Sequence, residues 1–283
     1  MTEFRRIGIL GPGLLGGSLA LALAKRHPDA AVTLWARSAE RVAEVRQSGY
    51  EHITADLDLT VKDADLVVLA VPVGAMRHLA EGLVASGAAP GLVVTDVGSV
   101  KGLPHEEVGG LLEDNGIKFI GSHPMAGSEQ TGFDAANADL FDGAPCILTN
   151  DQEFADAEVN RLVAFWGGLG CRVGVMSAQE HDTLVARISH MPHVLAAVCA
   201  LVALENEDDG HFAGGGLRDT SRVAAGDPQM WTEILLENQA AVVDPLRESA
   251  KLMQRLADLI ENGHEDALAT ALEEAQRRRR SLD

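Results

Sequence analysis

A glycine-rich turn between a short apolar run and an Ala/Leu-rich stretch constrains the fold of this chain more than any other feature. Residues 6–10 predict a strand, and residues 14–26 predict a helix. Between them, Gly11, Gly13 and Gly16 fit the pattern G-x-G-x-x-G. A match in this strand–turn–helix context is typical of a dinucleotide-binding loop, whereas an isolated match would indicate only a turn.

Each position of the loop has an expected role. Gly11 allows the tight turn, Gly13 lets the backbone approach a pyrophosphate, and Gly16 permits close packing of the helix on the strand. Leu14 and Leu15 open the helix, where exposed N–H groups and the helix dipole would hold the phosphates. We therefore predict a dinucleotide cofactor, NAD or NADP.

The rest of the first 176 residues alternates short apolar runs with helical stretches. Further strands are expected at residues 31–36, 65–71, 92–96, 119–121, 146–149 and 172–176, and helices at 39–48, 73–85 and about 153–166. Repeated alternation of strand and helix predicts βαβ units. The expected fold is therefore α/β, with a Rossmann-type, doubly wound and mainly parallel sheet.

The pattern changes after residue 176, because only helical periodicity follows. Helices are expected at residues 178–204, 229–260 and 264–280, with breaks at Asp227-Pro228 and Asn262-Gly263. We therefore predict a dinucleotide-binding domain at residues 1–176 and an all-helical substrate and dimerisation domain at 177–283. Helices this elongated cannot bury every apolar face alone, so we expect a homodimer formed through the helical domain.

Charge and cysteine content argue against several partners. The formal net charge is −19, and a nucleic-acid partner would need a basic face. Residues 277–280 are four arginines, which we interpret as a solvated helix end, with an interaction tail as the alternative. Cys146, Cys171 and Cys199 lack metal-ligand spacing, so we expect no metal and a reducing compartment.

No targeting signal is recognisable in the sequence. The first residues lead directly into the strand at 6–10, without the hydrophobic region of a signal peptide. A run of roughly 18 consecutive apolar residues, long enough to span a bilayer, is also missing. We therefore expect a cytoplasmic protein with no membrane partner.

The end of the second expected strand bears on the choice between NAD and NADP. An acidic residue there would bind the ribose hydroxyls of NAD, but the chain has Arg37 and Ser38 instead. An arginine at this place can accommodate a 2′-phosphate, so NADP is favoured over NAD, with an exposed loop charge as the alternative. Val71 and Pro72, where the strand at 65–71 ends, are further cofactor-binding candidates.

Polar clusters fall where the strands end and in the helical half of the chain. They occupy residues 96–102, 121–129, 188–193 and 214–222. Ligands of doubly wound sheets bind beyond the carboxyl ends of the strands, so the first two clusters are candidates for a site. His123 is expected in a Gly-rich loop just after a strand, where it is either a catalytic base or a turn-capping residue. The histidines at 27, 52, 78, 105, 181, 211 and 264 are interpreted as surface or structural residues.

Five ordered motifs beyond the glycine loop resemble the prephenate/arogenate (cyclohexadienyl) dehydrogenase family of tyrosine biosynthesis. They are residues 96–101 (DVGSVK), 121–127 (GSHPMAG), 189–193 (SHMPH), 218–222 (RDTSR) and 227–231 (DPQMW). The resemblance extends from residue 6 to about the last helix. It implies that the helical half dimerises and helps to close the active site.

The resemblance also implies a reaction, which is the oxidative decarboxylation of prephenate to 4-hydroxyphenylpyruvate with hydride transfer to NAD(P). Arogenate dehydrogenase, which yields tyrosine directly, is the alternative. His123 would be the base for the C4 hydroxyl, and Ser99 would hydrogen-bond the same hydroxyl. Arg222 would bind the side-chain carboxylate through two parallel hydrogen bonds, unless it forms a surface ion pair.

Further residues are assigned by the same resemblance. Ser128, Ser189 and His193 would line the rest of the pocket. Glu129 and Asp219 match positions that can pair with the arginine and gate the site. His190 and Trp231 are interpreted as packing or orienting residues.

Two other classes of protein remain open from the residues alone. A β-hydroxyacid dehydrogenase or a pyrroline-carboxylate reductase would share the same domain plan. The former is expected to rely on a lysine in the helical half, where Lys251 is the only lysine after Lys118 and lies in an expected packing helix. A nucleotide-binding redox sensor without turnover is the second alternative, and the grouping of Ser99, His123 and Arg222 argues against it.

Overall fold

The computed structural model describes residues 3–127 and 130–282, and the chain divides into two compact units, Met1–Asn238 and Gln239–Asp283. The first unit contains the whole predicted nucleotide-binding domain and the first helices of the predicted helical domain. The domain boundary after residue 176 stays a prediction.

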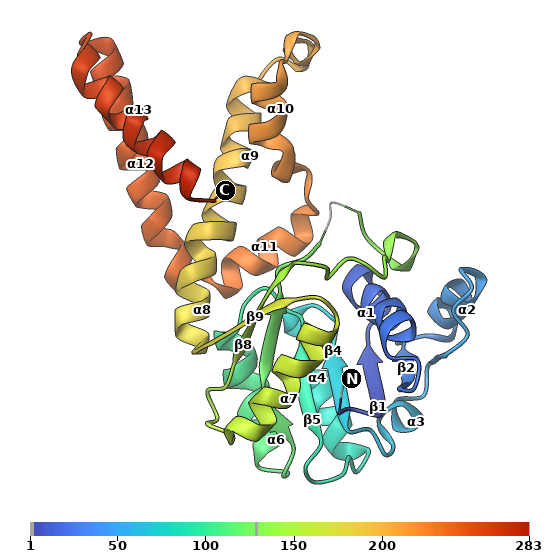
Figure 1. Cartoon of the computed structure of the whole chain (residues 1–283). Coiled ribbons are helices and arrows are strands. Elements are labelled where there is room, and N and C mark those ends of the chain that lie inside the picture. The colour runs from blue at the N-terminus through green and yellow to red at the C-terminus, as the bar shows by residue number, and fades with distance from the viewer. Residues whose placement is uncertain (1–2, 128–129, 283) are drawn as a thin grey trace. The chain divides into compact units, whose positions relative to one another are not determined.

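A parallel sheet of six strands forms the centre of the first unit (Figure 1). Its strands are β1 (Arg6–Leu10), β2 (Ala31–Trp35), β3 (Ile53–Thr54), β4 (Leu66–Leu69), β5 (Val93–Asp96) and β6 (Lys118–Phe119). They follow the order β3-β2-β1-β4-β5-β6, and every neighbouring pair is parallel. This is the strand order of dinucleotide-binding folds, so the predicted Rossmann-type fold is confirmed.

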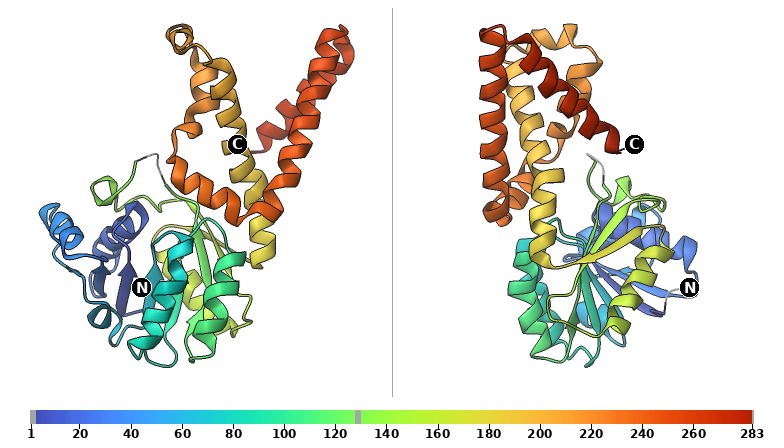
Figure 2. Two further views of the ribbon diagram at one scale, coloured as in Figure 1. Left: turned by 180° about the vertical axis from the view of Figure 1, so that it is seen from behind. Right: turned by 60° about the vertical axis from the view of Figure 1, so that its left-hand side comes forward.

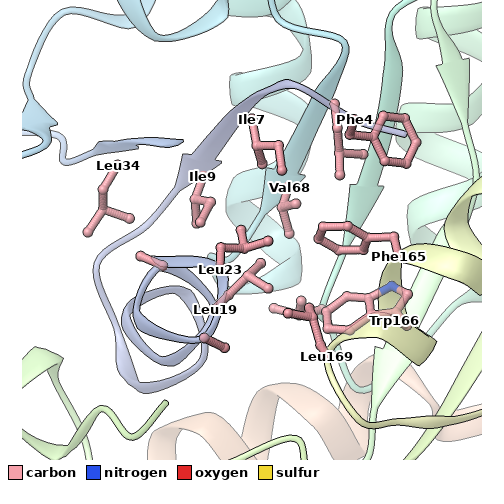
Figure 3. Packing of buried hydrophobic residues seen from close by; sticks show 14 of the residues in the cluster. Phe4, Ile7, Ile9, Leu19, Leu23, Leu34, Val68, Phe165, Trp166 and Leu169 are labelled. Carbon is pink, nitrogen blue, oxygen red and sulfur yellow. The ribbon is translucent and has the colours of Figure 1, made fainter. Parts of the chain in front are cut away.

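Helices cover both faces of this sheet, as Figure 2 shows from two sides. They are α1 (Leu14–Arg26), α2 (Ala39–Gln47), α3 (Leu57–Val61), α4 (Val73–Ala85), α5 (Gly102–Pro104), the π-helical turn η1 (His105–Gly109), α6 (Gly110–Glu113) and α7 (Asp156–Gly168). One core packs α1 and α7 on the sheet, with Phe165 and Trp166 fully buried (Figure 3). A second core packs α4 and α6 on the opposite face. Burial on both faces explains the uninterrupted apolar runs of β4 and β5.

A second sheet departs from the expectation of one continuous sheet. It consists of β7 (Gly121–Pro124), β8 (Pro145–Thr149) and β9 (Arg172–Met176), with β7 antiparallel to β8 and β8 parallel to β9. The predicted strand at residues 119–121 is wrong, because the chain leaves the first sheet at Ile120 and enters the second at Gly121. The partner of β7 is a strand about twenty residues further along, which no local pattern reveals.

The position of His123 is therefore also corrected. It lies within β7, opposite Ile147 of β8, and not in a loop after a strand. A strand fixes its backbone more firmly than a loop would, because ladder hydrogen bonds hold both neighbours.

A long interrupted helix follows the second sheet. It comprises α8 (Ala178–Val185), the π-helical turn η3 (Ala186–His190) and α9 (Met191–Ala203). Ser177 and Glu180 form a capping box at its start. Pro192 lacks the N–H that an α-helical ladder would use, which accounts for the wider turn before it.

By length and composition alone, Ala178–Ala203 is the one stretch in the described part of the chain that could cross a membrane. The expectation of no such segment considered only uninterrupted apolar runs and did not foresee it. His181, His190 and His193 are buried in this stretch, and polar groups of this kind are costly in hydrocarbon. The apolar composition therefore fits packing against protein better than packing against lipid.

The remaining elements of the first unit are short. They are η2 (Phe133–Ala135), η4 (Glu207–Phe212), α10 (Gly215–Ser221), η5 (Arg222–Ala225) and α11 (Pro228–Glu237). Asp227 caps α11 by accepting the Met230 N–H at 2.8 Å.

The second unit contains α12 (Gln239–Glu261), α13 (Glu265–Arg279) and the short turn η6 (Arg280–Leu282). A single helix over residues 229–260 was expected, but α11 ends at Glu237, and the buried side chain of the next residue, Asn238, bonds to other parts of the first unit. Arg277 and Arg278 pair with Glu274 on exposed α13, as expected of a solvated helix end.

Candidate active site

The glycine loop between β1 and α1 has the geometry that a dinucleotide requires. Gly11 has φ +118°, and a Cβ there would lie 2.2 Å from the Ala70 carbonyl oxygen. A Cβ on Gly16 would lie 1.9 Å from the Gly11 carbonyl oxygen, so both positions need glycine for the fold itself. A Cβ on Gly13, by contrast, would meet no atom within 4 Å. Gly13 therefore leaves open space where a pyrophosphate can approach the backbone.

The residues around the loop complete this fit. Leu14 and Leu15 are half-buried at the start of α1, where neither an acidic residue nor a capping side chain competes for the N–H groups. The Val71 side chain lies against Gly11, with its Cγ1 3.0 Å from an ideal Cβ position there. Pro72 is exposed and caps α4. The loop, the start of α1 and the end of β4 thus lie together, with open space next to Gly13.

The end of β2 presents positive charge near this loop. Arg37 is exposed, and the Ser38 hydroxyl accepts the Arg41 N–H at 3.3 Å at the start of α2. Arg41, which sequence reasoning missed, donates from Nη2 to the Pro12 carbonyl at 3.1 Å. Its place in a helix pattern gave no sign of this contact with the glycine loop.

A buried carboxylate anchors the two segments that carry the catalytic candidates. Asp96, at the end of β5, accepts the Gly98 N–H at 2.8 Å and the Ser122 N–H at 3.1 Å. It also pairs with the Lys101 ammonium, and both side chains are fully buried. Ser99, half-buried between these contacts, and His123, next to Ser122, are thereby held relative to one carboxylate. A direct Ser99–His123 hydrogen bond is not present among the described contacts.

His123 is buried and hydrogen-bonded to a second histidine. Its Nδ1 lies 2.8 Å from His181 Nε2, with the two rings edge to face. Burial, the Lys101 ammonium and the neighbouring His181 and His190 hold the pKa of His123 well below 6.5. His123 is therefore a neutral imidazole near neutral pH, which is the state that a general base requires.

His181 is the main residue that sequence reasoning missed. The interpretation of this histidine as a surface or structural residue overlooked that it is fully buried against His123. Its Nδ1 lies 2.8 Å from Asp182 Oδ1, and Asp182 accepts the Lys101 and Gly102 N–H groups at 2.8 Å each. The capping box places both residues in the first turns of α8, but their partners lie 58 to 81 residues away.

A second group of histidines lies on η3 and α9. His193 stacks on Trp231 of α11, with ring centroids 3.6 Å apart and planes 10° apart, and hydrogen-bonds the Val223 backbone. His190 Nδ1 lies 3.1 Å from Asn238 Nδ2, and burial lowers the pKa of His190 to about 4. His190 Nε2 and His193 Nδ1 are buried without a partner among the described contacts. Trp231 therefore orients His193, as its interpretation as an orienting residue requires.

Arg222 begins η5, directly before the residue that holds His193. Its guanidinium is exposed and has no ion pair within the described part of the chain, so it is available to an anionic ligand. Asp219 is exposed on α10, and the described contacts include no pairing of Asp219 with Arg222. Ser189 is half-buried in η3, while Ser128 and Glu129 lie outside the described residues.

The strand order, the open glycine loop and a buried neutral imidazole near the ends of β5 and β7 define a class of protein. A chain with these features is a dinucleotide-dependent dehydrogenase of the Rossmann type.

Comparison with known proteins identifies the family within this class. The profile described as "Prephenate dehydrogenase, nucleotide-binding domain" matches residues 19–175, and that described as "Prephenate dehydrogenase, dimerization domain" matches residues 177–274. The cyclohexadienyl dehydrogenase of Zymomonas mobilis is 35% identical, over 100% of this chain and 97% of its own length.

Solved structures agree with this assignment. The prephenate dehydrogenase of Aquifex aeolicus, in complex with hydroxyphenyl propionate and NAD+, superposes with a TM-score of 0.88 at 28% identity, covering 99% of this chain and 98% of that one. The arogenate dehydrogenase of Synechocystis gives 0.80 at 29% identity, covering 98% and 100%. The chain belongs to the prephenate dehydrogenase family, and the resemblance drawn from its motifs is confirmed.

Proposed function

We propose that this protein is a prephenate dehydrogenase, which converts prephenate to 4-hydroxyphenylpyruvate and CO₂ in tyrosine biosynthesis. The proposal rests on family membership and on one observation above all. His123 is a buried imidazole with its pKa well below 6.5, tied through Nδ1 to His181 so that Nε2 is the nitrogen left for a substrate. Arogenate is the alternative substrate, because relatives named for arogenate and for cyclohexadienyl substrates cover nearly the whole chain.

The residues divide the chemistry among themselves as follows. His123 accepts the proton of the C4 hydroxyl as the C4 oxygen becomes a carbonyl, and Ser99 donates a hydrogen bond to the same oxygen. Bound NAD(P) supplies the acceptor for the hydride that leaves C4. The C–C bond to the ring carboxylate breaks, CO₂ departs, and the electron pair of that bond completes the aromatic ring. The C4 oxygen thereby becomes a phenolate, which takes back the proton from His123 to give the phenol. Aromatisation makes the reaction effectively irreversible.

The far end of the substrate needs a cation. Arg222 presents an exposed guanidinium beside the segment that holds His193, so we assign it to the side-chain carboxylate. Ser189 and His193 line the pocket between them, and Ser128 is assigned to the same wall. Glu129 and Asp219 are proposed to gate the site by pairing with Arg222.

NADP is the cofactor that we favour, because Arg37, Ser38 and Arg41 provide cationic and hydroxyl groups where NAD-binding folds carry an acidic residue. We also propose a homodimer through the helical part and a cytoplasmic location. Leu201 and Val202 on α9 are 76% and 74% exposed, an apolar surface that a second copy would cover.

The test is an assay of the purified protein with prephenate or arogenate and with NAD+ or NADP+, followed through the absorbance of the reduced cofactor. We expect turnover with prephenate, faster with NADP+ at subsaturating cofactor. His123→Asn should lower kcat by roughly 10²–10⁴-fold while cofactor binding stays unchanged. Turnover in none of the four combinations would refute the proposal, and full activity of His123→Asn would remove His123 as the base.

A further inference from the structure

Three side chains, His123, His181 and Asp182, form a hydrogen-bonded line that starts at the proposed base and that we call the histidine line. His123 Nδ1 lies 2.8 Å from His181 Nε2, and His181 Nδ1 lies 2.8 Å from Asp182 Oδ1. Both histidines are buried, and the Asp182 side chain is only 15% exposed. The distances alone do not say which nitrogen carries a proton, but the far end of the line decides it.

Asp182 can only accept hydrogen bonds in this site. Burial acts to raise the pKa of Asp182, but hydrogen bonds from His181 and from the Gly102 and Lys101 N–H groups outweigh burial and lower it. Both carboxylate oxygens already accept a backbone N–H, at 2.8 Å each. An ionised carboxylate has no proton to donate, so His181 must donate from Nδ1.

The protonation of each ring then follows from its neighbour. With its proton on Nδ1, His181 presents a lone pair at Nε2, and only a donor can face that lone pair at 2.8 Å. His123 must therefore carry its proton on Nδ1, which leaves the lone pair on Nε2. We infer that His181 and Asp182 are positioning residues that hold His123 in the Nδ1–H tautomer, with Nε2 ready to take the substrate proton. This inference rests on the proposed function of His123 as the base.

The backbone keeps this line in place. Asp182 is held by the N–H groups of the segment 101–102, which follows Ser99, and its own carbonyl accepts the Asn238 side chain at 2.9 Å. The orienting carboxylate is thus attached to the same loop that carries the second catalytic candidate. A carboxylate–histidine pair orients the base of serine hydrolases in a comparable way, on unrelated folds.

The line also links the negative charge of Asp182, through His181, to His123, which becomes positive when it takes the substrate proton. In the described part of the chain, the charged and titratable groups near His123 are Lys101 and Asp96 near the end of β5, and His181, Asp182 and His190 on the helix. Lys101 and Asp96 pair with each other. Asp182 is therefore the one carboxylate among these that reaches a proton-bearing His123, through His181.

The direct test reads the tautomer without any turnover. Nitrogen NMR of ¹⁵N-histidine-labelled wild-type protein, with the His123 signals assigned from their loss in His123→Asn, distinguishes Nδ1–H from Nε2–H imidazole. We expect the Nδ1–H form at neutral pH. A resting enzyme with His123 protonated on Nε2 would overturn the inference, whether or not the protein turns over prephenate.

Matched variants test the role in catalysis. His181→Gln keeps a carbonyl oxygen about where Nε2 lies and should stay within roughly 10-fold of wild-type kcat, whereas His181→Leu should lower kcat by roughly 10²–10³-fold with cofactor KM unchanged. The controls are His105→Gln and His105→Leu, since His105 is another buried histidine with two hydrogen bonds, to Thr149 and Gln152.

The outcomes separate positioning from packing. If His181→Gln restores kcat and both His105 variants keep it, His181 acts through its acceptor atom. If the Gln and Leu variants of His181 lose kcat equally while remaining folded by thermal unfolding, the side chain only fills space and the inference is wrong. Should no variant and no wild type show turnover, the tautomer measurement still decides the inference, and the assay alone decides the function.

Discussion

The glycine loop and the line formed by His123, His181 and Asp182 are the two parts of the proposed site, and they are built in opposite ways. The loop at residues 11–16 uses backbone atoms of one contiguous segment, and its decisive feature is the absence of Cβ atoms at Gly11, Gly13 and Gly16. The histidine line uses side chains on segments separated by 58 and 81 residues. The comparison teaches that a loop defined by glycines without Cβ atoms can be recognised from the local sequence. A group of buried, hydrogen-bonded side chains from distant segments forms only after folding.

The two regions also differ in what holds them. Steric exclusion fixes the loop, since Gly16 and Gly11 leave no room for another shape. The histidine region depends on buried polar groups, each of which needs its partner, so a single loss leaves an unsatisfied group in a low-dielectric site. Substitutions in the loop should therefore destabilise the protein through steric clashes. Substitutions in the histidine region should destabilise it by leaving buried polar or charged groups without partners.

Within the loop, the largest effect should come from Gly16→Ala. Its Cβ would lie 1.9 Å from a backbone oxygen that cannot move aside, so we expect a loss of about 3 kcal/mol or more in unfolding free energy, or failure to fold. Gly13→Ala is the matched control, because a Cβ there meets no atom within 4 Å. It should keep the wild-type Tm but weaken NAD(P) binding by roughly 10-fold or more, measured by titration. Equal Tm losses in both would contradict the division of roles.

In the histidine region, Lys101→Met should show the cost of an unpaired buried charge. Removing the ammonium leaves Asp96 fully buried without its partner, for which we expect a loss of about 3–5 kcal/mol by urea unfolding. Lys118→Met is the control, because its pair with Glu158 is 29% and 20% exposed and should contribute about 1 kcal/mol or less.

The same substitution should change the pH dependence of the reaction. After burial, the Lys101 charge is the next cause that lowers the pKa of His123, so its removal raises that pKa. The base works only when neutral, and activity falls as pH drops through its pKa. Lys101→Met should therefore lose kcat/KM at a higher pH than wild type, whose activity should persist below pH 6.5. If kcat/KM of Lys101→Met and of wild type falls at the same pH on the acid side, Lys101 does not lower the pKa of His123.

Arg222→Gln tests the part of the site that neither region explains. Loss of a charge-assisted pair to the substrate carboxylate should raise KM for prephenate by roughly 10–100-fold, with a smaller change in kcat. Arg218→Gln, an exposed arginine on neighbouring α10, should leave KM unchanged. An unaltered KM in the Arg222 variant would exclude its carboxylate role.

The smallest expected effect belongs to Arg37→Asp at the edge of the cofactor region. An aspartate there would repel a 2′-phosphate and favour ribose hydroxyls, so the ratio of the KM values for NADP+ and NAD+ should rise by roughly 10-fold. If both KM values stay as in wild type, Arg37 lies outside the cofactor site and the preference for NADP loses its support.

The sequence by itself determined what local patterns encode. The glycine loop, most of the alternation of strands and helices up to β9, and the ordered motifs that identify the family could be predicted, because each depends on neighbours along the chain. The short strand β3 and the junction between β6 and β7 could not. The assignments of individual substrate-binding residues stay predictions.

The tertiary structure alone decided what depends on distant partners. It ended the first sheet at Ile120, placed His123 in a strand, and buried His181 beside it. It also ended α11 at Glu237, directly before Asn238, whose side chain bonds to Asp182 and His190. The physical reason is the same in each case, because hydrogen-bond partners and low-dielectric surroundings come from residues about 20 to 80 positions away, and only the folded chain brings them together.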